Sequence, residues 1–446
     1  MDRVLLNISF LKSFILDVET EKILYNKMMK ILVKEAQEIR DRYKGEFEIE
    51  KFLQLISKLD TDEKKQLAYD EFSKKQATEK YTYGHIFELL LEDTNDDKIA
   101  YALNYKLVNA DHFNPTIGKE KYYQIMRALN ATGQKVITST IQSFEDYFSA
   151  LLYRLIKENP EQYLHGKTID YATLITSDIE KLKEDLIEKE VEQLMYGVSE
   201  TIEKVNKNHK FQIEKYQHIW DNFIEMELHR NIIVHNMGIV NKTYLDKLPK
   251  SCKIVKEGAC LSCDQNCIQF KTNNLIKFAY LLYYLVGNSE FDLDELDKIA
   301  FDLLKNENWE VAEFAYDLLL KIKKLENAQK LSYVINKLNA KKHLFGMEKV
   351  QNEILQIDVS GMEIMFKVAK NLLLEEYSTI LEDLEQCYPH NYDAYALQTW
   401  PIFIEFRKTD KYKKFREKHK DTFGQYEYSP KVIVDEGLRE VENDQL

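Results

Sequence analysis

Apolar residues recur every three or four positions along most of the chain, which is the spacing of one buried face of an α-helix. Glycine (13) and proline (6) are scarce among the 446 residues, so few positions interrupt this pattern. We therefore expect an all-α protein. The clearest central patterns cover residues 119–158, 178–194, 211–236 and 274–287.

These four patterns predict a central antiparallel helical bundle over residues 119–287. The first pattern is either one long helix or two helices with a kink near Gly133, and it stops before Pro160. Glu145 lies within this pattern between apolar neighbours. We expect it to be a solvated surface carboxylate, because acidic residues are mostly exposed, and the alternative is a polar group beside the packed core.

Breaks in the pattern divide the chain into further regions. The sequence Asn114-Pro115-Thr-Ile-Gly118 marks a boundary, so residues 1–115 are predicted to form an N-terminal helical domain. Residues 288–425 are predicted to form short paired helices, in which small alanines beside large aromatics permit close crossing. This region resembles tetratricopeptide-type repeats with an uneven period. Residues 426–446 form an acidic tail.

Composition narrows the class of protein. Hydrophobic residues make up 44% and charged residues 31%, as in an ordinary core-forming protein. The net charge of -13 argues against broad, non-specific nucleic-acid binding but leaves room for a local basic groove. The most apolar stretch, Leu275–Val286, contains Lys277 and is too short to span a bilayer. The first residues lack the order of a signal peptide, so we expect a cytoplasmic protein without a membrane partner.

The candidate catalytic residues lie in one stretch of the chain, from Glu227 to Gly238. Glu227, Asn231 and His235 are spaced four apart, so a helix places them in one row. Arg230 lies about 140° around the helix from His235. Its side chain must therefore reach around the helix, or act together with a second copy of the same helix.

The run Arg230-Asn231-Ile-Ile-Val-His235, together with the residues that follow it, resembles the signature of the HEPN superfamily (higher eukaryotes and prokaryotes nucleotide-binding domains) in its bacterial endoribonuclease branch. The resemblance covers residues 119–287. It implies a metal-independent endoribonuclease, with no cofactor for catalysis, whose composite site forms between the two subunits of a homodimer or higher even oligomer.

The residue types suit such a reaction, in which the 2′-hydroxyl of RNA attacks the adjacent phosphate. His235 can move protons near neutral pH, and Arg230 can hold phosphate oxygens. Asn231 can donate to phosphate or orient His235, and Glu227 is a supporting residue that could hold Asn231 or pair with Arg230. The alternative is structural: a partly buried His235, and an Arg230 paired with Glu227 or Glu225.

Four of the five cysteines crowd into one predicted loop, residues 250–272. They are candidates for a tetrahedral structural zinc site, since two of them have the knuckle-like Cys-x-x-Cys spacing. The alternative is a set of reduced thiols in a variable loop. The candidate ligands are Cys252, Cys260, Cys263 and Cys267.

The resemblance suggests a regulated toxin or antiviral defence effector that cuts RNA. A free ribonuclease would harm its host, so an inhibitory or activating partner is expected. Two other functions remain open from the sequence. One is a non-catalytic helical scaffold or adaptor, which the low basic charge favours, and the other is a sensor that binds RNA or nucleotide without cutting it.

Overall fold

Every regular element of the computed structural model is a helix. It describes residues 3–42, 115–252, 255–261, 263–287 and 290–423, and within these the only β-type pairing is an isolated antiparallel bridge between Ile239 and Cys260. The predicted all-α class is confirmed. Within the same residues, no helix is long and apolar enough to cross a membrane.

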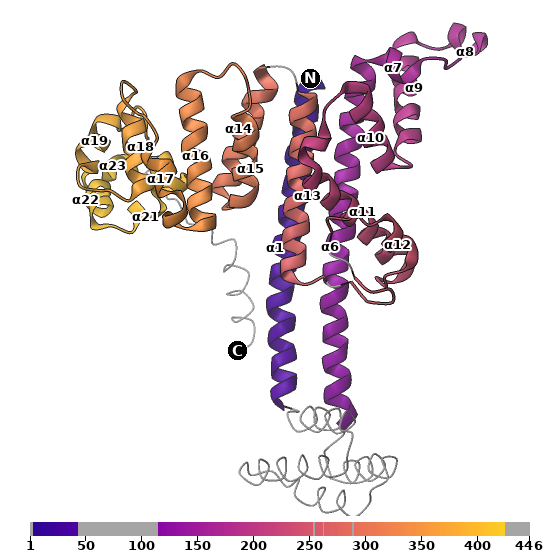
Figure 1. The fold of residues 1–446 in the computed structure, drawn as a ribbon, viewed down its shortest axis with the longest axis horizontal. Helices are drawn as coiled ribbons and strands as arrows, with labels where there is room; N and C mark the ends of the chain where they lie inside the picture. Colours follow the sequence, from indigo (N-terminus) through magenta and orange to yellow (C-terminus); the bar gives the residue numbers. More distant parts are fainter. Residues whose placement is uncertain (1–2, 43–114, 253–254, 262, 288–289, 424–446) are drawn as a thin grey trace, which may run out of the picture.

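Two long antiparallel helices, α1 (Arg3–Arg42) and α6 (Pro115–Glu158), form the spine of the molecule (Figure 1). Phe14 of α1 packs against Phe144 of α6, and Ala36 near the end of α1 packs near Ile125. The prediction placed α1 within a domain of residues 1–115. The side chains of α1 nevertheless belong to the same apolar cluster as the central bundle, so this core draws on both sides of the predicted boundary.

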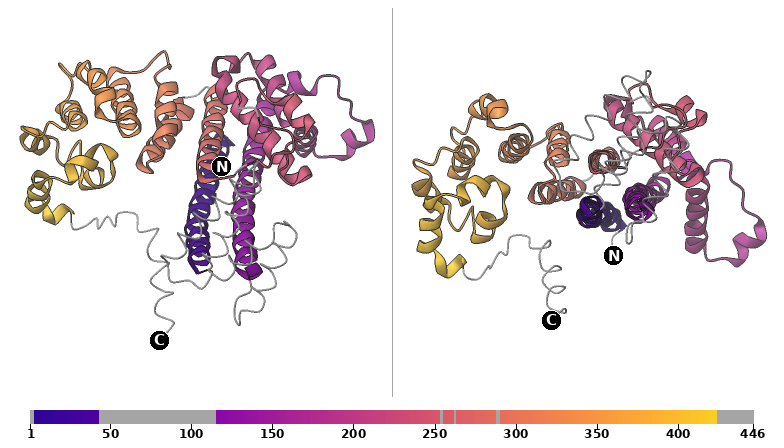
Figure 2. Two further views of the ribbon diagram at one scale, coloured as in Figure 1. Left: turned by 60° about the horizontal axis from the view of Figure 1, so that its bottom comes forward. Right: turned by 90° about the horizontal axis from the view of Figure 1, so that it is seen from below.

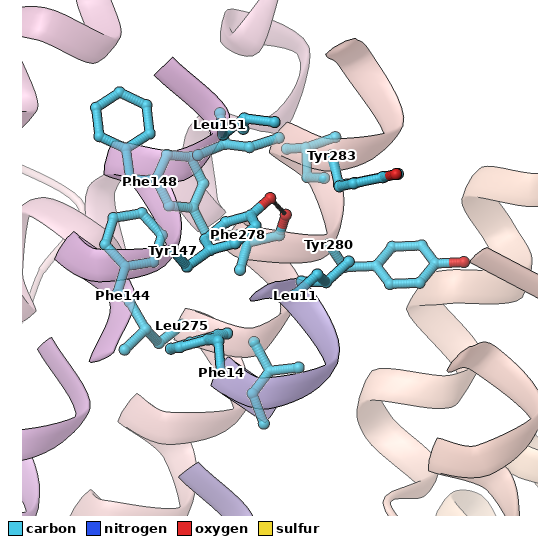
Figure 3. Packing of buried hydrophobic residues seen from close by; sticks show 14 of the residues in the cluster. Leu11, Phe14, Phe144, Tyr147, Phe148, Leu151, Leu275, Phe278, Tyr280 and Tyr283 are labelled. Carbon is cyan, nitrogen blue, oxygen red and sulfur yellow. Dashed lines mark hydrogen bonds between the residues drawn. The ribbon is translucent and has the colours of Figure 1, made fainter. Parts of the chain in front are cut away.

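Two further helices complete the bundle, α11 (Gln217–Asn236) and α13 (Gln265–Val286). The aromatic rings of Phe144, Phe223 and Phe278 meet where α6, α11 and α13 cross, with centroids 4.7 Å apart for Phe223 and Phe278. Figure 3 shows Phe144 and Phe278 among the buried residues of this core. Burial of such rings contributes a large share of the hydrophobic stabilisation of a core. This packing fixes the position of α11, which carries the Arg-Asn-x3-His motif.

A buried ion pair ties the end of α6 to α14 (Glu290–Lys305). Arg154 donates from both terminal nitrogens to the carboxylate of Asp292, at 3.2 and 3.3 Å, and Tyr283 of α13 donates its hydroxyl to the same carboxylate. Burial of a charge is costly unless it is paired and hydrogen-bonded. The pairing with Asp292 and Glu158 raises the pKa of Arg154, so the guanidinium stays charged.

Several smaller helices lie on one side of the spine (Figure 2). The predicted helix over 178–194 is confirmed as α9 (Ile179–Leu194), with Asp178 accepting from backbone amides as its N-cap. The helix predicted to begin near Phe211 begins later, because residues 213–216 form a 3₁₀ turn. The side also includes α7 (Pro160–Leu164), α8 (Tyr171–Thr176), α10 (Val198–His209), η1 (Ile213–Tyr216) and α12 (Lys242–Lys247).

Paired helices occupy the other side of the spine (Figures 1 and 2). Their core divides in two inside α16 (Asn327–Phe345): Tyr333 and Ala340 belong to the bundle cluster, whereas Ile335 and Leu338 belong to a second cluster that extends to Phe423. The remaining elements are α15 (Trp309–Leu319), α17 (Met347–Leu355), α18 (Ile364–Leu374), α19 (Ile380–Cys387), α20 (Ala394–Thr399), η2 (Pro401–Phe403), α21 (Ile404–Arg407), α22 (Asp410–Lys418) and α23 (Lys420–Phe423).

The long pattern over 119–158 is one continuous helix, which was one of the two predicted alternatives, and Gly133 packs against the backbone of Cys263 without breaking α6. Two other helix predictions needed correction, each for a local reason. The last bundle helix begins at Gln265 rather than Asn274, since Asp264 caps it. The apolar pattern over 397–406 predicts one helix, but the structure splits it at Pro401, which cannot donate a helical hydrogen bond. The apolar patterns over 49–56, 83–91 and 99–108 also predict helices, and these lie outside the described residues.

Candidate functional site

The helix α11 ends immediately after the motif. Met237 adopts a left-handed backbone conformation (φ 53°), and its N–H bonds to the carbonyl of Ile232. Gly238 follows with φ 77° and bonds to the same carbonyl at 3.1 Å. This places His235 in the last turn of the helix.

The row Glu227, Asn231 and His235 forms as predicted, but its members differ in burial. Glu227 and Asn231 are half-buried, and His235 is exposed. The exposure of His235 excludes the alternative of a partly buried structural histidine in the single chain. The row therefore runs from the packed middle of the bundle outward to the surface at the end of α11.

Arg230 reaches around the helix toward this row. Its Nη1 donates to Oδ1 of Asn231 at 3.1 Å. Because Asn231 and His235 are only about 40° apart around the helix, the bond draws the guanidinium toward the face that carries His235. Arg230 is half-buried, so its side chain can still be reached by a ligand.

A second carboxylate, Glu145 of α6, lies close enough for the charge of Arg230 to act on it. Glu145 is half-buried, which corrects the prediction of a solvated surface carboxylate. Burial raises the pKa of Glu145, and the positive charge of Arg230 partly offsets that rise. The packing of α11 on α6 explains the difference, because it covers the face of α6 that carries Glu145.

The predicted support role of Glu227 is not seen in its contacts. Burial raises the pKa of Glu227, and hydrogen bonds from Ser199 of α10 oppose that rise. In the described part of the chain, neither Glu227 nor Glu225 forms an ion pair with Arg230. Glu225 pairs with Lys271 of α13 instead, at 3.0 Å.

Exposed apolar residues lie close to His235 in the sequence. Val234, Met237 and Ile239 are 54%, 81% and 39% exposed, respectively, at the end of α11. Isolated exposed apolar residues are ordinary, but three beside one polar site form a surface suited to a partner.

The predicted cysteine loop is shorter than expected, and its thiols differ in their surroundings. All four are free: Cys260 is exposed, Cys252 and Cys267 are half-buried, and Cys263 is buried. Cys267 lies in the first turn of α13 rather than in a loop. Among the described residues, no three His, Cys, Asp or Glu side chains already converge on a metal position.

His229 is the residue that the sequence analysis missed. It is 2% exposed, and its Nε2 lies 3.7 Å from Sγ of Cys263. Burial, together with the nearby charge of Lys271, lowers the pKa of His229 to about 3, so the imidazole is neutral. Its register with the buried residues Phe223, Met226 and Ile232 on α11 was the signal that could have identified it.

Comparison of the chain with protein-family models, curated proteins and solved structures finds no match. The functional argument therefore depends on the residues of α11 and on their surroundings.

Proposed function

We propose that the protein is a metal-independent endoribonuclease of the HEPN type, with a composite site made by two copies of α11. The observation that carries the proposal is the hydrogen bond from Arg230 to Asn231, which turns a guanidinium toward the face of an exposed His235. Guanidinium, amide and imidazole are the groups needed to bind a phosphate and move protons around it.

The proposed reaction uses these side chains directly. One imidazole of His235 removes the proton from the 2′-hydroxyl, which attacks the adjacent phosphorus, and the 5′-oxygen leaves after accepting a proton. Arg230 stabilises the negative charge that develops on the phosphate oxygens. Asn231 accepts a hydrogen bond from the guanidinium and so holds it toward His235, and the negative charge of Glu145 favours its position electrostatically.

A second copy of the chain supplies the remaining groups. A single α11 carries one Arg230 and one His235. In the proposed composite site, the guanidinium of one subunit acts with the imidazole of the other, which takes the proton from the 2′-hydroxyl and then gives one to the 5′-oxygen. A two-fold axis beside the apolar residues Val234 and Met237 would bring two such helices together, and two-fold symmetry is the commonest form of homodimer. The activity is expected to serve as a regulated toxin or defence function, under an inhibitory or activating partner.

RNA cleavage in the presence of a chelator tests the proposal. Wild type is expected to cut, and His235→Ala and Arg230→Ala are expected to lower the rate by about 100-fold or more, the usual contribution of an acid–base group. His218→Ala on the exposed side of α11 and Arg127→Ala on the exposed side of α6 are matched controls that should retain activity.

Mixing the two inactive variants tests the shared site. A mixed dimer contains one intact His235 and one intact Arg230 on different subunits, so part of the activity should return. Induced expression in cells provides a second measurement, in which wild type is toxic and His235→Ala is not. Wild type that neither cuts RNA nor harms cells would contradict the proposal and favour the scaffold or sensor function.

A further inference from the structure

A seam of reactive and charged side chains runs between α11 and the start of α13. Each helix contributes residues four apart, which therefore share one face. Two contacts set the antiparallel register: Glu225 with Lys271 at 3.0 Å, and His229 Nε2 with Cys263 Sγ at 3.7 Å. The seam consists of Asp221, Glu225 and His229 from α11, and Cys263, Cys267 and Lys271 from the facing segment.

The groups at the centre of this seam are unusually buried for their chemistry. His229 is 2% exposed, Cys263 4% and Lys271 6%. Burial of an imidazole or ammonium costs free energy unless a partner offsets the loss of water. Apolar residues at these positions would pack without that cost. The presence of polar and charged side chains here therefore needs a functional or structural reason.

The backbone of Cys263 is held from two other helices. Tyr25 of α1 donates its hydroxyl to the Cys263 carbonyl at 2.8 Å. Gly133 of α6 approaches so closely that an added Cβ would lie 2.4 Å from the same carbonyl oxygen. The position of the Cys263 thiol relative to His229 is therefore fixed by the fold.

This fixed pair has the spacing of two ligands of one metal ion. Zinc binds thiolate at about 2.3 Å and imidazole at about 2.0 Å, so tetrahedral geometry separates the two ligand atoms by about 3.6 Å. The observed distance is 3.7 Å. Cys260 precedes Cys263 with knuckle spacing, and Cys267 follows it one helical turn later.

We propose that His229, Cys260, Cys263 and Cys267 form a structural site for one tetrahedral zinc-type ion. His229 and Cys263 are already at ligand spacing. The thiols of Cys260 and Cys267 lie close enough for their charges to act on Cys263, and binding requires them to turn toward the ion. This ligand set differs from the four cysteines predicted from the sequence at one position, because His229 takes the place of Cys252. Cys252 lies beside the Asp221 end of the seam instead, where its Sγ is 3.8 Å from the carbonyl oxygen of Asp221.

Lys271 provides a positive charge close to the proposed ligands. Its buried ammonium pairs with Glu225 at 3.0 Å and also acts on Cys263 and Cys267, where it opposes the rise in thiol pKa that burial causes. Each thiol releases its proton on binding a metal ion, so a nearby positive charge favours the bound state.

A nucleophilic role for the His229–Cys263 pair fits less well. Burial raises the pKa of the Cys263 thiol to about 12, and the adjacent thiols of Cys267 and Cys260 add to the rise. Cys263 is also closed to substrate at 4% exposure. A reactive cysteine is partly exposed and has a lowered pKa, whereas a metal ion deprotonates a buried thiol when it binds.

Metal analysis of the full chain tests the site. Protein produced with added zinc and purified under reducing conditions is expected to carry one equivalent of zinc, measured by elemental mass spectrometry. Cys263→Ser and His229→Ala should each lose most of it. Cys387→Ser, at a buried cysteine of α19, and His218→Ala are matched controls that should retain it.

Two measurements keep the result interpretable if a variant fails to fold. Cobalt(II) added to metal-free wild type should give the absorption bands of a tetrahedral thiolate site. His229→Cys should retain metal and increase the thiolate-to-cobalt band, because it replaces nitrogen with sulfur. A wild-type protein that carries no metal, or a Cys263→Ser variant that keeps its metal, would overturn the site. A Cys252→Ser variant that loses the metal while Cys260→Ser keeps it would overturn the proposed ligand set. None of these readouts requires ribonuclease activity.

Discussion

At the scale of single residues, adjacent positions on α11 face different surroundings. His229 points into the core against Cys263, while Arg230 bonds to Asn231 at the half-exposed face. Helical periodicity predicted the row that ends at His235. It could not predict the partners of Arg230, because Glu145 lies on a helix that is distant in the sequence and approaches only when α11 packs on α6.

Gly133 provides a prediction at this scale. Glycine to alanine in a helix interior ordinarily stabilises by about 1 kcal/mol. Gly133→Ala should instead destabilise by roughly 1–3 kcal/mol, because the new methyl group would overlap the Cys263 backbone. Urea unfolding measures the change in the free energy of unfolding, with Lys135→Ala as the control on the exposed face of α6. Stabilisation by Gly133→Ala would show that the Cys263 segment does not pack there.

At the scale of elements, the sequence predicted the end of a helix correctly wherever a residue that starts or stops helices stands there. Asp178 marks the start of α9, and Pro160 follows the end of α6. The early start of α13 was missed because Asp264 was read as part of a polar loop. The helix α10 was missed because its buried residues, Val198, Ile202 and Val205, are few and separated by charged positions.

Asp297 of α14 gives a pH-dependent prediction at this scale. Burial, together with the charge of Asp294, raises its pKa to about 6, and a hydrogen bond with Tyr333 of α16 partly opposes the rise. A carboxyl with a raised folded pKa contributes stability at low pH that is lost as pH rises through about 6. Asp297→Asn should therefore stabilise the protein by roughly 1–3 kcal/mol at pH 8 and have little effect at pH 4.

Denaturant unfolding at the two pH values measures this difference. Asp302→Asn is the matched control, since Asp302 is exposed on the same helix, is not among the charges that act on Asp297 and should change stability little at either pH. Equal effects of Asp297→Asn at pH 4 and pH 8 would rule out a titrating buried carboxyl between α14 and α16.

At the scale of the whole molecule, the sequence predicted the all-α class but neither how the helices are arranged around α1 and α6 nor how the cores divide. The pattern of α1 is helical, yet nothing in it specifies α6 as its partner across a long sequence separation. Likewise, the bundle predicted from the helix pattern ends at residue 287, whereas its apolar core continues through α14 and α15 into α16. Such long-range packing becomes visible only in three dimensions.

Assembly of two chains is the prediction at this scale. Light scattering with gel filtration should give the mass of a dimer or higher even oligomer. Met237→Asp should weaken association by about 100-fold, because a two-fold axis beside Met237 would bring two new carboxylates together. Leu355→Asp, at an exposed apolar residue at the end of α17, is the control that should leave the mass unchanged. A monomeric wild type at all concentrations would contradict the paired site.

The shared helix α16 has a consequence for cooperativity. Tyr333 and Ile335, only two positions apart, belong to different apolar clusters. The indole of Trp400 donates a hydrogen bond to the next residue of the helix, Asn336. Neither cluster can lose its helices without exposing apolar side chains of the other. A ligand that rigidifies the C-terminal helices would thereby also reduce local opening of the bundle, so the two halves share one stability rather than two.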